Sequence, residues 1–145
     1  MAKSLPEETG LDHAAMEATL AISPYQNWLG LKLDKCMAGE ISITCPWRED
    51  LVSNPNLGSV HGGVLAALID LGGLYSILTQ STRVRSTVDL RVDYHAPATP
   101  DGGTMTSTST VLTIGGKIST AETRISDANG TLIASGRGVY MMAKA

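Results

Sequence analysis

The chain of 145 residues contains no phenylalanine and only two cysteines, and 17% of its residues are charged. It has no block of lysine and arginine and its formal net charge is −3, so nucleic acid is not expected as a partner. Cys36 and Cys45 lack the spacing to histidine or cysteine that a zinc site needs, so we expect no metal and no cofactor. The N-terminus lacks the apolar core of a secretion signal, which predicts a cytoplasmic protein with reduced thiols.

Two missing motifs and the length of one apolar run exclude further classes of protein. The segment Gly58-Ser59-Val60-His61-Gly62 does not have the Gly-x-Ser-x-Gly order of a nucleophile elbow, which disfavours a serine hydrolase. The segment Gly115-Gly116-Lys117 lacks the upstream glycine of a phosphate-binding loop. The long apolar run over residues 63–78 contains Asp70 and is shorter than the roughly 20 residues of a membrane span, so no membrane partner is expected.

That apolar run is the feature around which the chain is organised. Residues 64–78 contain no Lys, Arg, Glu, Asn or Gln, which predicts a helix over about 62–80 that is buried on every side. Asp70 lies in its middle, and a buried carboxylate costs several kcal/mol unless it is paired or used. Asp70 is therefore a candidate functional residue. The alternative is a structural role, in which it caps or pairs with an arginine such as Arg83 or Arg85.

Most other segments show the two-residue alternation or the Thr, Ser, Val and Ile content of β-strands. Alternation within one of them predicts that Val88, Leu90, Val92 and Tyr94 face one way and Thr87 the other. The predicted strands cover residues 31–36, 40–45, 87–94, 104–114, 117–126 and 131–142.

The order of the elements predicts an α+β fold: a curved antiparallel sheet wrapped around one long central helix, with the last four strands in a meander. Asp12 is a suitable N-cap for a short helix over 13–20, and residues 48–59 are predicted to be a loop. We expect an N-terminal extension over 1–24 and a single domain over 25–145. Because one sheet cannot easily cover the whole helix, a second subunit is expected to cover the rest.

The loop from Asn54 to Gly63 resembles the Asn-x-x-Gly-x-x-His-Gly-Gly signature of hotdog-fold acyl-CoA thioesterases of the PaaI-like, phenylacetate-degradation type. Asp70 follows nine residues after His61, and Thr87 opens a matching segment on the next strand. The resemblance covers about residues 25–142. It implies a hotdog fold, hydrolysis of an acyl-CoA or aryl-CoA to free acid and CoA, and a homo-oligomer with sites between subunits. That oligomer is either a dimer or a dimer of dimers, and the second of these is a homotetramer.

The resemblance also implies catalytic residues. Asp70 acts as general base or as nucleophile, Thr87 helps to position the attacking water, and His61 shapes the loop beside the thioester. Gly62 lies where a helix N-terminus presents backbone N–H groups, which suit a developing oxyanion. The family's loop Asn falls at a proline in this chain, with an asparagine on either side. The residues expected to bind substrate are Asn56, Gly63, Val64, Arg85 and Lys117.

The residues leave other interpretations open. The glycine pair at 62–63 also suits a flexible joint, Thr87 an ordinary strand position, and His61 a structural role. The same fold also suits a non-catalytic acyl-CoA-binding or regulatory module, which predicts binding without thiol release. A hotdog hydratase is disfavoured, because the Asp/His pair five residues apart that it needs is absent.

Overall fold

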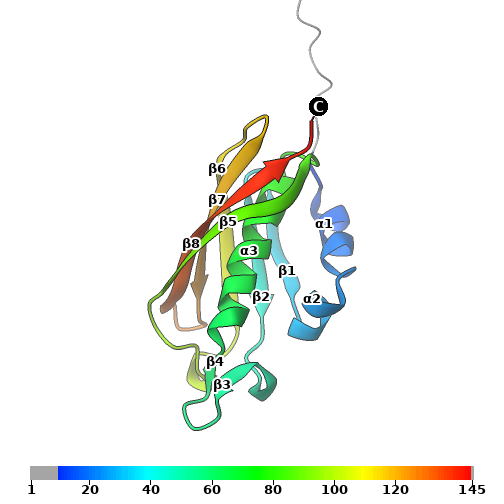
Figure 1. The fold of residues 1–145 in the computed structure, drawn as a ribbon. Helices are drawn as coiled ribbons and strands as arrows, with labels where there is room; N and C mark the ends of the chain where they lie inside the picture. The colour runs from blue at the N-terminus through cyan, green and yellow to red at the C-terminus, as the bar shows by residue number, and fades with distance from the viewer. Residues whose placement is uncertain (1–9, 145) are drawn as a thin grey trace, which may run out of the picture.

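The computed structural model describes residues 10–144. Figure 1 shows the long helix α3 lying across a sheet, with the shorter helices α1 and α2 beside strand β1. The sheet is antiparallel, with the order β1-β2-β6-β7-β8-β5. The predicted α+β fold, a helix packed on one antiparallel sheet, is confirmed. The helices are α1 His13–Leu20, α2 Pro24–Leu29 and α3 Gly62–Leu78, and the strands of this sheet are β1 Lys32–Met37, β2 Glu40–Cys45, β5 Val84–Tyr94, β6 Met105–Thr113, β7 Ile118–Ser126 and β8 Leu132–Met142.

Two predictions about connections are wrong. Strands β6, β7 and β8 form a meander, but β5 pairs with β8 at the edge of the sheet and β6 pairs with β2. The link from β5 to β6 spans residues 95–104, which is too long for a tight hairpin. The predicted loop over 48–59 contains a 3₁₀ turn, Glu49–Leu51, and a small hairpin made of β3, Val52–Asn54, and β4, Ser59–Val60. This hairpin lies at the N-terminal end of α3 (Figure 1).

The first helix begins where the capping pattern predicts. The Asp12 carboxylate accepts a hydrogen bond from the Ala15 N–H at 2.9 Å, which satisfies one of the open donors of the first turn. Met16 and Leu20 are buried and pack with Ile41 of strand β2. The helix therefore contributes to the core, and the expected domain boundary at residue 24 stays a prediction.

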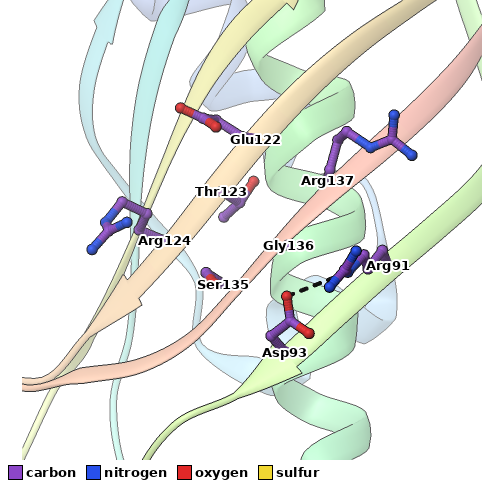
Figure 2. A pocket seen from close by; sticks show the side chains of 8 residues that line it. All are labelled: Arg91, Asp93, Glu122, Thr123, Arg124, Ser135, Gly136 and Arg137. Carbon is purple, nitrogen blue, oxygen red and sulfur yellow. Dashed lines mark ion pairs between the residues drawn. The ribbon is translucent and has the colours of Figure 1, made fainter.

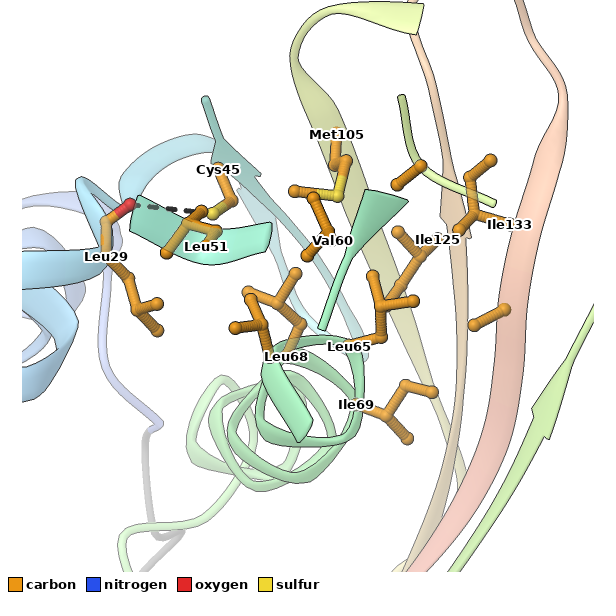
Figure 3. Packing of buried hydrophobic residues seen from close by; sticks show 13 residues of the cluster. Leu29, Cys45, Leu51, Val60, Leu65, Leu68, Ile69, Met105, Ile125 and Ile133 are labelled. Atoms are coloured by element: carbon orange, nitrogen blue, oxygen red, sulfur yellow. Dashed lines mark hydrogen bonds between the residues drawn. The ribbon is translucent and has the colours of Figure 1, made fainter. Parts of the chain in front are cut away.

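Helix α3 packs closely on the sheet through one face only. Leu65, Leu68 and Ile69 are at most 3% exposed and contact buried residues of β6 and β7, including Met105 and Ile125 (Figure 3). The sheet covers only this face, as the sequence predicts for a single sheet, and burial of the rest of the helix by a second subunit stays a prediction. A stripe of side chains at helical spacing stays partly exposed, namely Ala66, Ala67, Asp70, Leu71, Leu74 and Leu78.

The close approach of α3 to the sheet depends on glycine. A Cβ added at Gly73 would overlap the Tyr140 hydroxyl, whereas a Cβ at Gly116 would meet nothing within 4 Å. We expect Gly73→Ala to lower the free energy of unfolding by about 1–3 kcal/mol through overpacking, and Gly116→Ala to leave it nearly unchanged. Urea unfolding of the two variants measures this. Equal stability of Gly73→Ala and the unmodified chain would contradict the packing argument.

No helix within residues 10–144 combines the length and the apolar character needed to cross a membrane.

Candidate active site

A carboxylate and a hydroxyl meet between α3 and β5. Asp70 is partly exposed in the single chain, and its Oδ1 accepts a hydrogen bond of 2.5 Å from the Thr87 Oγ1. Within the described residues, no lysine, arginine or histidine forms an ion pair with Asp70. Arg85 donates instead to the carbonyl oxygens of Thr82 and Val84. The carboxylate is thus oriented by a neutral donor, and the interpretation of Asp70 as the partner of an arginine is not supported.

A β-bulge directs Thr87 toward the helix. The pairing of β5 with β8 shifts register between Thr87 and Asp89, so that Val88 is the extra residue. Strict alternation predicts Thr87 on the face opposite Leu90, and this prediction is wrong. The bulge restarts the alternation, so Thr87 reaches Asp70 while Leu90 packs against the core on the same side. Nothing in the sequence predicted this bulge, because a bulge at Val88 requires no particular residue type.

Tyr140 supports the same turn of the helix and was missed by the sequence analysis. Its side chain is fully buried in β8, and its hydroxyl donates to the backbone carbonyl oxygen of Asp70 at 2.9 Å. Burial, and then the negative charge of Asp70, raise the pKa of the Tyr140 phenol well above its ordinary value. The phenol therefore keeps its proton and remains a donor. Its place on the helix-facing side of a predicted strand is the only signal that pointed to it.

At the N-terminus of α3, the backbone N–H of Gly62 is open within the described residues. His61 is the N-cap, and its Nδ1 accepts the Gly63 N–H at 2.9 Å. The His61 carbonyl oxygen accepts the Val64 N–H at 2.9 Å. Within the described residues, the Gly62 N–H has no acceptor. The N–H of Gly62, the predicted oxyanion donor, is therefore available to a ligand, whereas the N–H of Gly63 is occupied.

A groove opens beside this donor. It has a volume of about 370 Å³ and is lined by Gly62, Leu65, Tyr94 and residues 95–98, among others. The Tyr94 hydroxyl donates to the Gly62 carbonyl oxygen at 2.9 Å. Val64, expected to bind substrate, does not line this groove and is 8% exposed in the core. The groove thus brings an open N–H next to apolar and aromatic side chains.

The remaining predicted substrate residues lie apart from one another. Asn56 is exposed in the β3–β4 turn, and its backbone N–H donates to the Asn54 side chain at 3.0 Å, so Asn54 is used by the turn. Arg85 lies near the start of β5, and Lys117 lies in the β6–β7 turn, at the end of the sheet where α3 ends (Figure 1). Only Asn56 therefore lies at the end of the molecule that carries the open Gly62 N–H.

A second hollow lies on the face of the sheet away from α3. It has a volume of about 270 Å³, and Figure 2 shows its charged side chains in front of the strands with the helix behind them. Arg91 and Asp93 form an ion pair of 3.4 Å there, and Arg137 lies on the neighbouring strand. The sheet separates these charges from Asp70, so they do not belong to the same site.

Within residues 10–144, no three side chains of His, Cys, Asp or Glu are grouped so as to hold a metal ion.

Comparison with known proteins supplies the family. The family model of the thioesterase superfamily matches residues 57–134. A protein of Halobacterium salinarum, VNG_1336C, whose name assigns it provisionally to the esterases, is 31% identical over 91% of this chain and 95% of its own length. The medium/long-chain acyl-CoA thioesterase YigI of Salmonella typhimurium is 28% identical over 82% of this chain and 85% of its own length.

A solved structure identifies the fold. The PaaI protein of Escherichia coli, from the phenylacetic acid degradation operon, superposes with a TM-score of 0.78 at 20% identity over 88% of this chain and 90% of that chain. The segment matched by the family model contains Asp70, Thr87 and the glycines at the start of α3. The chain therefore belongs to the thioesterase superfamily, and it is a thioester hydrolase with the hotdog fold that it shares with PaaI.

Proposed function

We propose that the protein hydrolyses the thioester of an acyl-CoA or aryl-CoA to the free acid and CoA, in the cytoplasm, as a homo-oligomer with sites between subunits. The observation that carries this proposal is the Asp70 carboxylate, which is held by Thr87 and has no cationic partner among the described residues. The acyl-CoA thioesterase name of the YigI relative supports the substrate class. A measurement of thiol release over a panel of acyl chain lengths and aryl-CoAs tests the proposal. Saturable binding without thiol release would favour a non-catalytic module.

The geometry of α3 supports a site between two copies. Gly62 and Asp70 are eight residues apart on one helix, which places them about 12 Å apart at 1.5 Å per residue. A reacting carbonyl has to lie about 3 Å from both the attacking group and the oxyanion donor. This separation along the helix axis favours a site in which the two groups come from different chains, and we propose that Asp70 of one copy acts with Gly62 of another.

The edge of the sheet offers a place for the second copy. Within the described residues, β5 pairs with β8 alone, so its other edge leaves backbone donors and acceptors open. This edge adjoins the partly exposed stripe of α3, because Thr87 of β5 contacts Asp70. A second copy that covers both would bury the stripe and bring a second helix N-terminus to the site. A measurement of the mass of the protein in solution distinguishes a dimer from a tetramer.

The proposed reaction uses water, the Asp70 carboxylate and the Gly62 backbone N–H. The Asp70 carboxylate removes a proton from water as the water oxygen adds to the thioester carbon, and the Gly62 N–H binds the oxyanion. The intermediate then collapses, the carbon–sulfur bond breaks, and the CoA sulfur leaves and takes up the proton. In the alternative route, the carboxylate itself attacks, releases the CoA thiolate and forms an anhydride, which water then hydrolyses. Thr87 orients the carboxylate in either route.

The proposed roles of the substrate residues follow from where they lie. Asn56 is exposed beside the N-terminus of α3 and is proposed to bind the thioester arm. The absence of a side chain at Gly63 lets substrate approach the helix closely, and Val64 forms part of the core behind it. Arg85 and Lys117 are proposed to contact CoA phosphates at the other end of the helix.

Loss of the Thr87 hydroxyl is expected to reduce activity by misorienting Asp70. A hydrogen bond to a charged group contributes about 1.5–3 kcal/mol, so Thr87→Val should lower kcat/KM by about tenfold to a hundredfold. Thr87→Ser retains the hydroxyl and serves as the matched control, with a loss of no more than a few-fold. Thiol-release kinetics measure both variants. If the valine and serine variants have the same kcat/KM, the hydrogen bond does not contribute to catalysis.

A further inference from the structure

We propose that Tyr94 is a positioning residue, which acts through the peptide between Gly62 and Gly63 to hold the His61 ring with its Nε2–H directed toward the substrate. This inference rests on the proposed function, because it names a further residue of the same site. Tyr94 lies outside the motif that carries the family resemblance. The sequence predicted its face of the strand but gave it no role in the site.

One peptide unit connects the two side chains. The Tyr94 hydroxyl donates to the Gly62 carbonyl oxygen at 2.9 Å. The N–H of the same peptide belongs to Gly63 and donates to the His61 Nδ1 at 2.9 Å. A peptide whose carbonyl accepts a hydrogen bond becomes a stronger donor at its N–H, so the first bond strengthens the second. The three groups therefore form a continuous hydrogen-bond chain.

This chain defines the protonation pattern of the ring. Because the Nδ1 of His61 accepts an N–H, it carries no proton, and a neutral imidazole then carries its proton on Nε2. The exposed His61 side chain, at the N-cap of α3, thus carries its donor on Nε2. A donor placed there adds to the open Gly62 N–H in binding a thioester carbonyl oxygen.

The strand and the helix hold Tyr94 in place. Tyr94 is the last residue of β5, and it pairs with Ala134 of β8. Its ring lies against the backbone of Gly62, where an added Cβ would stand 3.3 Å from ring carbon atoms. It also lines the groove of about 370 Å³ that contains Gly62. Strand β5 therefore supports α3 at two points: Thr87 holds Asp70, and Tyr94 holds the first turn.

Removal of the hydroxyl alone tests the proposal. In Tyr94→Phe the ring still covers Gly62, but the hydrogen bond to its carbonyl oxygen is lost. We expect kcat to fall about threefold to tenfold with KM changed less than twofold, as the loss of one hydrogen bond predicts. Tyr25→Phe is the matched control, because Tyr25 is exposed on α2, stacks on Trp28 and lies outside the groove. Unchanged kcat in Tyr94→Phe would overturn the proposal.

Two further measurements separate positioning from a merely structural role. The ¹⁵N NMR spectrum of His61 should show a protonated Nε2 and an unprotonated Nδ1, and this preference should weaken in Tyr94→Phe but not in Tyr25→Phe. In a His61→Asn background, where an amide oxygen can still cap the helix, Tyr94→Phe should cost less than twofold in kcat. Full additivity of the two substitutions, or an unaltered His61 spectrum, would overturn the proposal. If the unmodified protein releases no thiol, the proposed function is wrong, and the NMR comparison still tests Tyr94.

Discussion

Replacement of Asp70 by Asn is expected to lower kcat by about a hundredfold to ten-thousandfold, the range that a general base contributes. An amide can neither take a proton from water nor attack the thioester, so both proposed routes fail. The variant should remain folded, because the amide oxygen can still accept the Thr87 hydrogen bond and Tyr140 binds the backbone of residue 70. Thiol release at saturating substrate measures the loss, and circular dichroism checks the fold.

The matched control for this experiment is Asp93→Asn. Asp93 is also an aspartate of the sheet region, but it pairs with Arg91 at 3.4 Å on the face of the sheet away from α3. Its removal should leave turnover within a factor of two, since exposed ion pairs contribute little. Hydrolysis by Asp70→Asn at the rate of the unmodified protein would remove Asp70 from the mechanism.

Replacement of Gly62 by Pro is expected to lower kcat by about a hundredfold to a thousandfold, as for the loss of one oxyanion donor. Proline has no N–H, so the substitution deletes the Gly62 N–H, which has no acceptor within the described residues. The backbone is suited to it, because Gly62 is the first helical residue, where proline is well tolerated. The preceding residue, His61, has φ −57° and ψ 132°, which is compatible with a following proline.

Gly62→Ala controls for the added bulk. Both substitutions place a Cβ 3.3 Å from the Tyr94 ring, but alanine keeps the N–H. We expect the alanine variant to retain activity within about tenfold of the unmodified protein, since it loses no hydrogen bond of the oxyanion site. The difference between the two variants then measures the N–H itself. Equal kcat values for alanine and proline would show that this N–H does not bind the oxyanion.

A mixture of the two inactive variants tests the shared site. When Asp70→Asn and Gly62→Pro subunits are unfolded together and refolded as mixed dimers, one of the two sites in each mixed dimer receives both intact residues. Random pairing should restore about a quarter of the activity of the unmodified protein, because half of the dimers are mixed and each has one complete site. If Asp70 and Gly62 act within one chain, mixing restores nothing.

Local sequence patterns predicted several elements of the fold and the family of the chain. An apolar run with one carboxylate predicted the central helix, and Asp12 marked where the first helix begins. The resemblance of the loop from Asn54 to Gly63, with Asp70 and Thr87 at matching positions, indicated the thioesterase superfamily, which the comparisons confirm. Local signals of this kind survive because helix periodicity, capping and turn chemistry are decided by neighbouring residues.

Three features were decided by the tertiary structure. The bulge at Val88 turns Thr87 toward Asp70 against the strand alternation, since register depends on the pairing of β5 with β8. The contact of Tyr94 with Gly62 joins residues 32 positions apart. The sheet covers one face of α3 only, which leaves Asp70 partly exposed in the single chain.

The amino-acid sequence by itself thus predicted the central helix, the six strands of the large sheet and the candidate groups, and the resemblance of its loop motif indicated the superfamily. The tertiary structure decided which of these groups meet: Thr87 with Asp70, and Tyr94 with Gly62. It also left the stripe of α3 that carries Asp70 partly exposed, because the sheet of one chain covers only the face that carries Leu65, Leu68 and Ile69.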